Sequence, residues 1–177
     1  MFMNMSNKKK DYYYYYDRRF LAVAHEEKAW GYIEKEDYEI AISELTKAIE
    51  NSNEPGDHYL PMEFYVERGE CYFKEYDYDN AIADFNEALK LDPNYCRALS
   101  KRAETNAYFQ LYDEAIDDYT RLIELNPDNA HYYFERGFNY SDAGLYNKAI
   151  NDYEKVLELE PSNEAAAHNI KILTEVK

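Results

Sequence analysis

Residues 62–95 read MEFYVERGECYFKEYDYDNAIADFNEALKLDPNY, and the same chemistry returns every 34 residues, from Cys96 and from Ala130. Each copy holds a small residue, an aromatic residue, an Ala-Ile pair, a second aromatic residue and a closing proline. In chain order the copies place there Gly69, Ala103 and Gly137; Tyr78, Tyr112 and Tyr146; Ala81, Ala115 and Ala149; Phe85, Tyr119 and Tyr153; and Pro93, Pro127 and Pro161. Such a period is typical of a solenoid of stacked supersecondary units, which bind partners along their surface.

A fourth copy precedes these three with the same internal spacing. It is formed by Ala29, Tyr38, Ala41, Ile42 and Leu45. Ala29 stands 40 residues before Gly69, so six residues are inserted between the copies. The insertion falls in residues 52–61, whose turn-forming residues predict an enlarged loop.

Each copy predicts a pair of helices. Apolar residues recur at helical spacing in two runs, as in Tyr65 and Tyr72 and then Ile82, Phe85 and Leu89. The breaks between runs fall at Tyr76-Asp77, Leu111 and Gly144-Leu145. Glycine inside a helix costs about 1 kcal/mol relative to alanine. The glycines of the first helices therefore predict a close approach, which we assign to the alanine twelve residues later on the partner helix.

The pattern resembles the tetratricopeptide repeat family over roughly Ala22 to Pro161. One departure is Asn106, which stands where the other copies have Tyr32, Tyr72 and Tyr140. The resemblance implies an all-α, right-handed solenoid of helix-turn-helix units. The expected repeats cover about 22–55, 62–95, 96–129 and 130–161, within a solenoid spanning 18–161.

The two ends of the chain depart from the repeat. Residues 1–17 contain Lys8 to Lys10 and the run Tyr12 to Tyr16, and we expect a disordered low-complexity leader. A phosphorylatable or adhesive tyrosine tag is the alternative interpretation. Residues 162–177 carry apolar side chains without the repeat scheme, which predicts a helix that caps the last repeat.

Composition narrows the classes of partner and location. The net charge of -16 argues against nucleic acid, whose phosphates would be repelled, and favours partners with basic patches. No run of apolar residues is long enough to cross a membrane, and the N-terminus is not a secretory signal. The 2 cysteines provide no disulfide framework, which fits a reducing compartment. We therefore expect a cytoplasmic protein.

The chain shows no pattern of residues that predicts catalysis. Its histidines share no metal-ligand spacing with one another or with the cysteines, and no glycine-rich phosphate loop is present. We expect no enzymatic activity, no cofactor and no metal site.

A charged pattern recurs with the repeat. Arginine precedes the small residue in three copies, and aspartate follows sixteen residues later, which gives Arg68 and Asp84, Arg102 and Asp118, and Arg136 and Asp152. In the first copy Lys28 and Glu44 take these places. Partly buried charges need partners, so the pattern predicts a ladder of ion pairs between packed helices. A role for the arginines in ligand contact is the alternative.

The resemblance also implies that the first helices line an inner groove. The residues it places there are Trp30, Glu67, Glu70, Phe73, Arg97, Lys101, Glu104, Tyr108, Phe134 and Phe138. This groove is aromatic and mostly acidic, with one basic spot at Arg97 and Lys101. Exposed aromatic residues among charges indicate a surface that a partner covers. For Trp30, Phe73 and Phe138, packing as core residues between neighbouring helices stays open.

These observations predict a non-enzymatic scaffold that captures a protein or peptide segment, basic and with apolar anchors, in the groove. One alternative is a chaperone-type adaptor that binds acidic C-terminal peptides, since Arg97 and Lys101 resemble part of the basic clamp of such adaptors. The other clamp places carry Glu26, Trp30 and Glu67, and the two glutamates would repel a carboxylate. A second alternative is self-assembly through the solenoid ends or the 52–61 loop. We expect a monomer or weak self-association.

Overall fold

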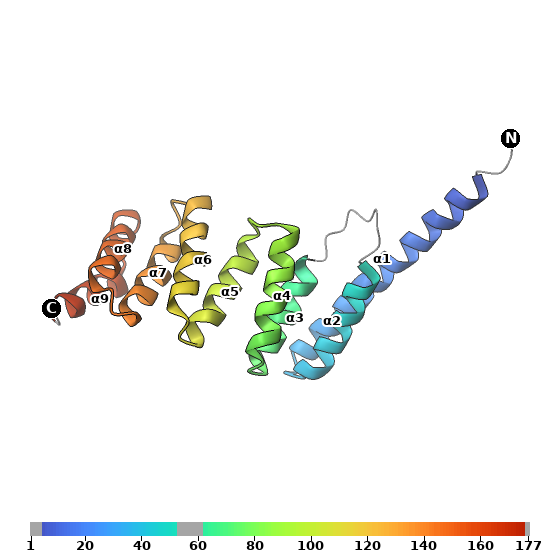
Figure 1. Ribbon diagram of the computed structural model, residues 1–177, viewed down its shortest axis with the longest axis horizontal. Coiled ribbons are helices and arrows are strands. Elements are labelled where there is room, and N and C mark those ends of the chain that lie inside the picture. Colours follow the sequence, from blue (N-terminus) through green and yellow to red (C-terminus); the bar gives the residue numbers. More distant parts are fainter. Residues whose placement is uncertain (1–4, 53–61, 176–177) are drawn as a thin grey trace. The chain divides into compact units, whose positions relative to one another are not determined.

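The computed structural model describes the backbone of residues 5–52 and 62–175, and side chains from Arg18 onward within those ranges. All regular structure in these ranges is helical, as Figure 1 shows, which confirms the all-α prediction. The helices are α1 (Met5–Ile33), α2 (Tyr38–Ser52), α3 (Met62–Lys74), α4 (Tyr78–Leu91), α5 (Cys96–Tyr108), α6 (Tyr112–Leu125), α7 (Ala130–Asp142), α8 (Tyr146–Leu159) and α9 (Glu164–Glu175). Residues 53–61 of the expected loop lie outside the described residues.

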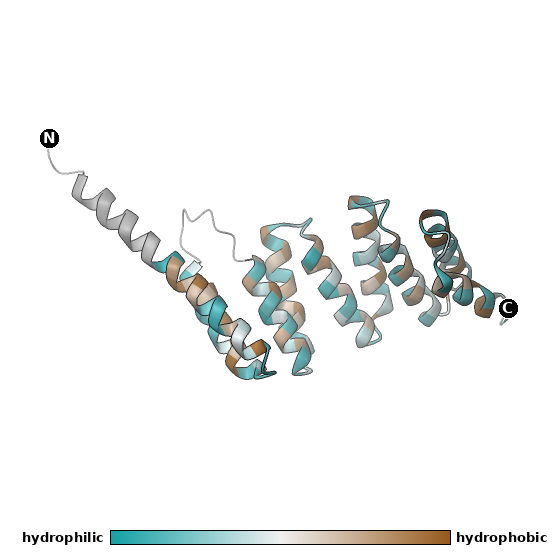
Figure 2. Cartoon of the chain, turned by 180° about the vertical axis from the view of Figure 1, so that it is seen from behind, coloured by the Kyte–Doolittle hydropathy of each residue, from teal (hydrophilic) through white to brown (hydrophobic). Residues whose placement is uncertain are grey.

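The chain forms two compact units, Met1–Pro93 and Asn94–Lys177, which we describe separately. In the first unit α1 packs on α2, α2 on α3 and α3 on α4. Its core combines small and large apolar side chains: Ala22, Ala29, Ala41, Leu45, Ala48, Ile49, Phe64 and Cys71. Figure 2 shows hydrophobic and hydrophilic residues on the same helices, as expected for helices that bury one face.

In the second unit α5 packs on α6, α6 on α7, α7 on α8 and α8 on α9. One core cluster is formed by Ala130, Ala149, Tyr153, Val156, Ala166 and Leu173. The last two of these residues belong to α9, so α9 buries an apolar face against α8. That contact covers a surface of α8 which a further repeat would otherwise cover.

Helix α1 differs from the expectation of a disordered leader over residues 1–17, because its helical backbone begins at Met5. Between Met5 and Trp30 the sequence contains neither proline nor glycine. Once a packed segment has nucleated a helix, each further residue adds a hydrogen bond, so the helix continues until something stops it. The side chains of Tyr12 to Tyr16 lie outside the described residues, and the tyrosine-tag interpretation with them.

The turns inside the helix pairs confirm the predicted breaks and share one geometry. Glu36, Tyr76, Gln110 and Gly144 have positive φ angles of 61°, 60°, 63° and 74°. After each of them the next backbone N–H reaches back to a carbonyl five residues earlier, as from Leu111 N to Asn106 O at 2.8 Å. This is the Schellman arrangement, which satisfies carbonyls that the helix end leaves open.

The close approach at the glycines is confirmed, but the predicted contact residue is wrong. A Cβ on Gly69 would lie 2.6 Å from Cε1 of Phe85, and a Cβ on Gly137 would lie 3.0 Å from Cε1 of Tyr153. The aromatic residue sixteen positions later, and not the alanine twelve positions later, therefore occupies the space. A long aromatic side chain reaches across the helix pair, whereas the methyl group of alanine stays close to its own helix.

The ion-pair ladder is confirmed in the last three copies. Each arginine donates two hydrogen bonds to the carboxylate of its aspartate, with Arg102 Nε and Nη2 at 2.8 and 2.6 Å from Asp118. The matching distances are 2.8 and 2.7 Å for Arg68 with Asp84, and 2.8 Å twice for Arg136 with Asp152. These hydrogen bonds raise the pKa of Arg102, and they oppose the rise that burial causes in the pKa of Asp118.

Two of the arginines also connect neighbouring repeats. Arg68 donates to Thr46 Oγ1 at 2.9 Å, and its guanidinium lies 5.8 and 6.0 Å from the ring centroids of Tyr65 and Tyr72. Arg136 repeats the arrangement, donating to Thr120 Oγ1 at 3.1 Å beside two tyrosine rings. Arg68 and Arg136 therefore each tie their own helix pair together and also join it to the helix before it.

In the first copy the expected Lys28–Glu44 pair is replaced by another arrangement. Glu44 accepts a hydrogen bond from His25 Nδ1 at 2.7 Å and another from Lys47. Both bonds lower the pKa of Glu44, the one from Lys47 most strongly. Lys28 is exposed, and Glu44 has as its partners His25, one turn before Lys28 on α1, and Lys47 on α2 itself.

Candidate functional site

The first unit presents an exposed indole that is fixed in place. Trp30 on α1 is 48% exposed, yet its Nε1–H donates to Glu67 Oε1 on α3 at 2.9 Å. Glu67 is buried, so its carboxylate is held by the surrounding helices. The hydrogen bond restricts the orientation of a large aromatic surface that water still reaches. Because the ring is already oriented, the Trp30 side chain loses less conformational entropy when a partner covers it than a mobile ring would lose.

The remaining predicted residues of the first unit are less exposed. Glu70 and Phe73, both on α3, are partly buried. The ring of Phe73 is therefore partly packed between helices and partly exposed to solvent, whereas about half of the surface of Trp30 is exposed. The structure brings Trp30 and Glu67 together directly, and this pair forms the part of the predicted site with defined geometry in this unit.

In the second unit, the predicted basic spot lies on α5 next to an acid. Lys101 Nζ lies 3.0 Å from Glu104 Oε2, one helical turn away. Arg97 is partly buried on the same helix. Tyr108, at the end of α5, is 56% exposed and meets Phe109 edge to face, with ring centroids 5.3 Å apart. The charge of the basic spot is thus partly neutralised within its own helix.

Helix α7 carries two aromatic residues with different surroundings. Phe134 is partly buried and packs on Tyr153 of α8, with ring centroids 5.5 Å apart. Phe138, one turn further along α7, is 49% exposed. Packing between helices accounts for Phe134, while Phe138 presents half of its surface to water. The open alternative of core packing therefore does not describe Trp30 or Phe138.

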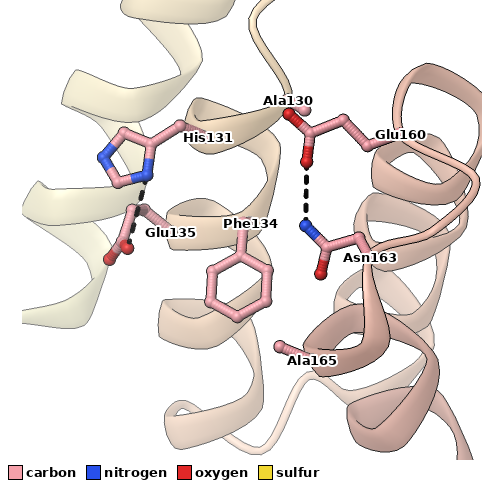
Figure 3. Close-up of a pocket in the computed structure, with 7 residues that line it drawn as sticks. All are labelled: Ala130, His131, Phe134, Glu135, Glu160, Asn163 and Ala165. Carbon is pink, nitrogen blue, oxygen red and sulfur yellow. Dashed lines mark hydrogen bonds and ion pairs between the residues drawn. The ribbon is translucent and has the colours of Figure 1, made fainter.

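A hollow of about 380 Å³ opens at the start of α7. Its lining comes from α7, from the turn after α8 and from the start of α9, and consists of Ala130, His131, Phe134, Glu135, Glu160, Asn163 and Ala165. Figure 3 shows Phe134 between two polar pairs, His131 with Glu135 on one side and Glu160 with Asn163 on the other. A second hollow of about 540 Å³, formed by residues 125–130 and Glu160, shares Ala130 and Glu160 with the first.

Each polar pair beside this hollow has its own geometry. His131 Nδ1 lies 3.8 Å from Glu135 Oε1, which is an ion pair when the imidazole is protonated. Burial raises the pKa of Glu135, and Glu104 on α5 adds to the rise while His131 opposes it. On the other side, Asn163 Nδ2 donates to Glu160 Oε2 at 2.9 Å, and Asn163 Oδ1 accepts from Ala166 N at 3.0 Å. Asn163 thus caps α9 and positions Glu160 at once.

Glu160 and Asn163 are the residues that sequence reasoning missed. Both lie in the turn between α8 and α9, beyond the fourth helix pair, and the repeat pattern says nothing of them. The sequence Ser162-Asn163-Glu164 is a helix-start signal and could have located the cap. It could not have shown that the same amide holds an acid beside Phe134.

Two negative observations concern the described residues alone. Within them, no three His, Cys, Asp or Glu side chains are grouped so that they could bind a metal ion. Within the same ranges no helix combines the length and apolarity that crossing a membrane requires.

Both cysteines are free thiols, and burial raises the pKa of Cys71 to about 12, so this thiol is a poor nucleophile.

Comparison with known proteins agrees with the repeat geometry. Tetratricopeptide repeat family models match residues 62–95 and 130–163, and a related TPR repeat model matches 106–144. The chain belongs to the tetratricopeptide repeat family. Repeats of this family serve generally as non-enzymatic protein-interaction modules, and the fold is that of a protein-protein interaction scaffold.

Solved structures share this fold. A crystal structure of MamA protein is 24% identical with a TM-score of 0.74, covering 88% of this chain and 81% of that chain. A second MamA crystal structure is 25% identical with a TM-score of 0.72, covering 84% and 83%. The first TPR of Spaghetti (RPAP3), bound to the HSP90 peptide SRMEEVD, is 28% identical with a TM-score of 0.59, covering 65% of this chain and 91% of that chain.

Proposed function

We propose that this protein is a non-enzymatic scaffold that captures a basic partner segment on the faces of its first helices. The observation that carries the proposal is the exposure of Trp30, Tyr108 and Phe138 on α1, α5 and α7. On the second helices the large rings of Tyr119 and Tyr153 are buried, and Tyr146 of α8 is less exposed, at 36%. Exposed aromatic rings are the residue type that dominates binding energy at protein interfaces.

In this proposal the acidic side chains and the aromatic side chains make different contributions to binding. Glu67, Glu70 and Glu104 stand near the aromatic residues on α3 and α5. Acids of this kind speed the encounter with a basic segment and make binding dependent on salt. The rings of Trp30 and Phe138 supply the affinity that remains once water is excluded. An extended or helical segment with apolar side chains between basic ones fits both features.

We propose that residues 18–161 contain the repeats of the solenoid and that residues 162–177 form its cap. The proposal also places the protein in the cytoplasm as a monomer or weakly self-associating species. Self-assembly through the ends of the solenoid is the competing interpretation. Light scattering on the purified chain separates the two, because self-assembly requires a mass that rises with concentration.

A chaperone-type adaptor is the second candidate function. It is favoured by the likeness to the Spaghetti TPR, whose bound HSP90 peptide is SRMEEVD. The places that would face a carboxylate carry buried Glu26 and buried Glu67, and Lys101 lies against Glu104. Buried carboxylates near an acidic peptide would repel it, so we expect SRMEEVD to bind much more weakly than a basic segment.

Selection from a random peptide library displayed on phage tests the proposal. The immobilised chain should enrich peptides that combine Lys or Arg with aromatic or aliphatic residues. Phe138→Ala and Trp30→Ala should each reduce binding of an enriched peptide by about tenfold or more, the range of an interface hot spot. Leu91→Ala is the matched control, since Leu91 is exposed on the second helix α4.

The outcomes of this selection are distinct. Enrichment of acidic C-terminal peptides would support the adaptor and overturn the proposed function. Equal binding of the enriched peptide to Phe138→Ala, Trp30→Ala and Leu91→Ala, with all three variants folded by circular dichroism, would show that the first-helix faces do not bind the partner.

A further inference from the structure

We propose that the hollow over Ala130 and Phe134 binds one cationic side chain, arginine or lysine, of the partner segment. The inference rests on the proposed function, since it names the chemical group that one part of the first-helix surface recognises. It concerns the second unit alone, because every lining residue belongs to that unit.

The shape of the hollow suits a long side chain with an aliphatic stem. Its volume of about 380 Å³ is open because Ala130 and Ala165 are small where they line it. Phe134 provides an aromatic wall, and its contact with Tyr153 holds the ring in place. The methylene groups of arginine or lysine pack against such a wall, while a cation is attracted to the face of an aromatic ring within about 6 Å.

The charges around the hollow favour a cation. Glu135 and Glu160 stand on opposite sides of Phe134 (Figure 3), and Asp128 lines the adjoining hollow. Among the described residues that line the two hollows, neither lysine nor arginine occurs, and His131 alone can carry positive charge. Burial already raises the pKa of Glu135, so its anionic form gains from a cationic side chain nearby. A neutral or acidic side chain would desolvate these carboxylates without compensation.

The carboxylate of Glu160 is held in position before any ligand binds. Asn163 bonds it through Nδ2 and is itself fixed by the bond from Ala166 N to Asn163 Oδ1. The start of α9 thus fixes the position of the Glu160 carboxylate on this side of the hollow. A preformed acceptor reduces the entropy that binding would otherwise lose.

Titration of the ¹⁵N-labelled full chain with single amino-acid probes tests the inference. The cationic probe is Nα-acetyl-arginine N-methylamide, and its neutral match is the citrulline compound, which has nearly the same shape. We expect saturable shifts of the Asn163 side-chain amide and of the Ala165 amide. Citrulline should bind about tenfold more weakly, because it lacks the ion-pair and cation–π terms. Equal binding of both probes would overturn the inference.

Variants then assign the effect to the two carboxylates. Glu135→Gln with Glu160→Gln keeps the shape of both side chains and should abolish the preference for arginine over citrulline. Glu114→Gln with Glu154→Gln changes the net charge equally at exposed positions of α6 and α8, outside both hollows, and should retain it. Loss of the preference in both double variants would indicate attraction by the overall charge alone and would overturn the site.

This test needs no partner protein, so it fails independently of the proposed function. If the probe binds while Trp30→Ala and Phe138→Ala leave peptide capture unchanged, the cation site is supported and the proposed binding by the aromatic residues is overturned. If the aromatic variants lose peptide capture and the probe does not bind, the proposed function is supported and the cation site is overturned.

Discussion

Trp30 and Glu67 are 37 residues apart in the sequence and are joined by a hydrogen bond of 2.9 Å from Nε1 to Oε1. The donor side chain is about half exposed and the acceptor residue is buried. The bond therefore joins the first helices of two successive repeats and orients an aromatic surface without covering it. It also engages the carboxylate of Glu67, one of the acids at the places where a chaperone adaptor would need a base.

Removing the acceptor should loosen the indole. Glu67→Ala should lower the fluorescence anisotropy of Trp30 and increase its quenching by iodide, because the ring loses its fixed orientation. The chain has 1 tryptophan, so the signal reports this site alone. Loss of a hydrogen bond of this kind should also lower the free energy of unfolding by about 1 kcal/mol. Glu63→Ala, at an exposed position of α3, is the control, and an indole equally mobile in both variants would contradict the role of Glu67.

The ladder should respond as a coupled pair. Arg102→Met leaves the buried carboxylate of Asp118 without its bidentate partner and should lower the free energy of unfolding by about 3 kcal/mol. Combining it with Asp118→Leu should recover part of the loss, since no unpaired charge then remains. Urea denaturation of the wild type, both single variants and the double variant measures the coupling. Strict additivity would remove the pairing and restore a ligand role for the arginine.

The glycines should differ in their tolerance of a side chain. Gly137→Leu should destabilise by about 3 kcal/mol, because even a Cβ there lies 3.0 Å from Cε1 of Tyr153 and 3.3 Å from Cβ of Asp152. Gly31 on α1 has no atom within 4 Å of a Cβ, so Gly31→Ala should stabilise by about 0.5–1 kcal/mol through helix propensity. Thermal unfolding followed by circular dichroism compares the two. A neutral Gly137→Leu would show that the close-packing account is wrong.

Two glutamates should affect the pH dependence of stability in opposite directions. The pKa of Glu44 is lowered by its bonds from Lys47 and His25, so its carboxylate stabilises the fold above the unfolded pKa, and this contribution is lost as pH falls through the lower folded pKa. The pKa of Glu135 is raised by burial, so ionisation at rising pH disfavours the fold. At neutral pH, Glu44→Gln should therefore destabilise, while Glu135→Gln should be neutral or stabilising.

Urea denaturation over a pH series measures both contributions. The stability difference between wild type and Glu44→Gln should shrink as the pH is lowered into the range where carboxylates titrate. The difference for Glu135→Gln should shrink over the same direction with the opposite sign. Curves that change in the same direction for both variants would contradict the assignment of the two pKa shifts.

Much of the fold could be predicted because repeated spacing reports local structure. Apolar residues at helical intervals place the helix pairs, and the positions of Tyr76-Asp77 and Leu111 mark where they break. The sixteen-residue separation of Arg102 and Asp118 indicated a pair across two helices, since both recur in step with the repeat. The candidate site is less predictable, because the sequence places Trp30 and Phe138 only through the family resemblance and does not determine how exposed they are.

The amino-acid sequence by itself determined the repeat, the helical class, the ladder and the acidic character of the chain, because each depends on spacing that recurs with the repeat or on composition. Tertiary structure alone decided which side chains meet in three other places. Phe85 rather than Ala81 fills the space beside Gly69, His25 rather than Lys28 reaches Glu44, and Asn163 holds Glu160. Such contacts depend on side-chain length, rotamer and the path of each turn, and a periodic pattern carries none of that information.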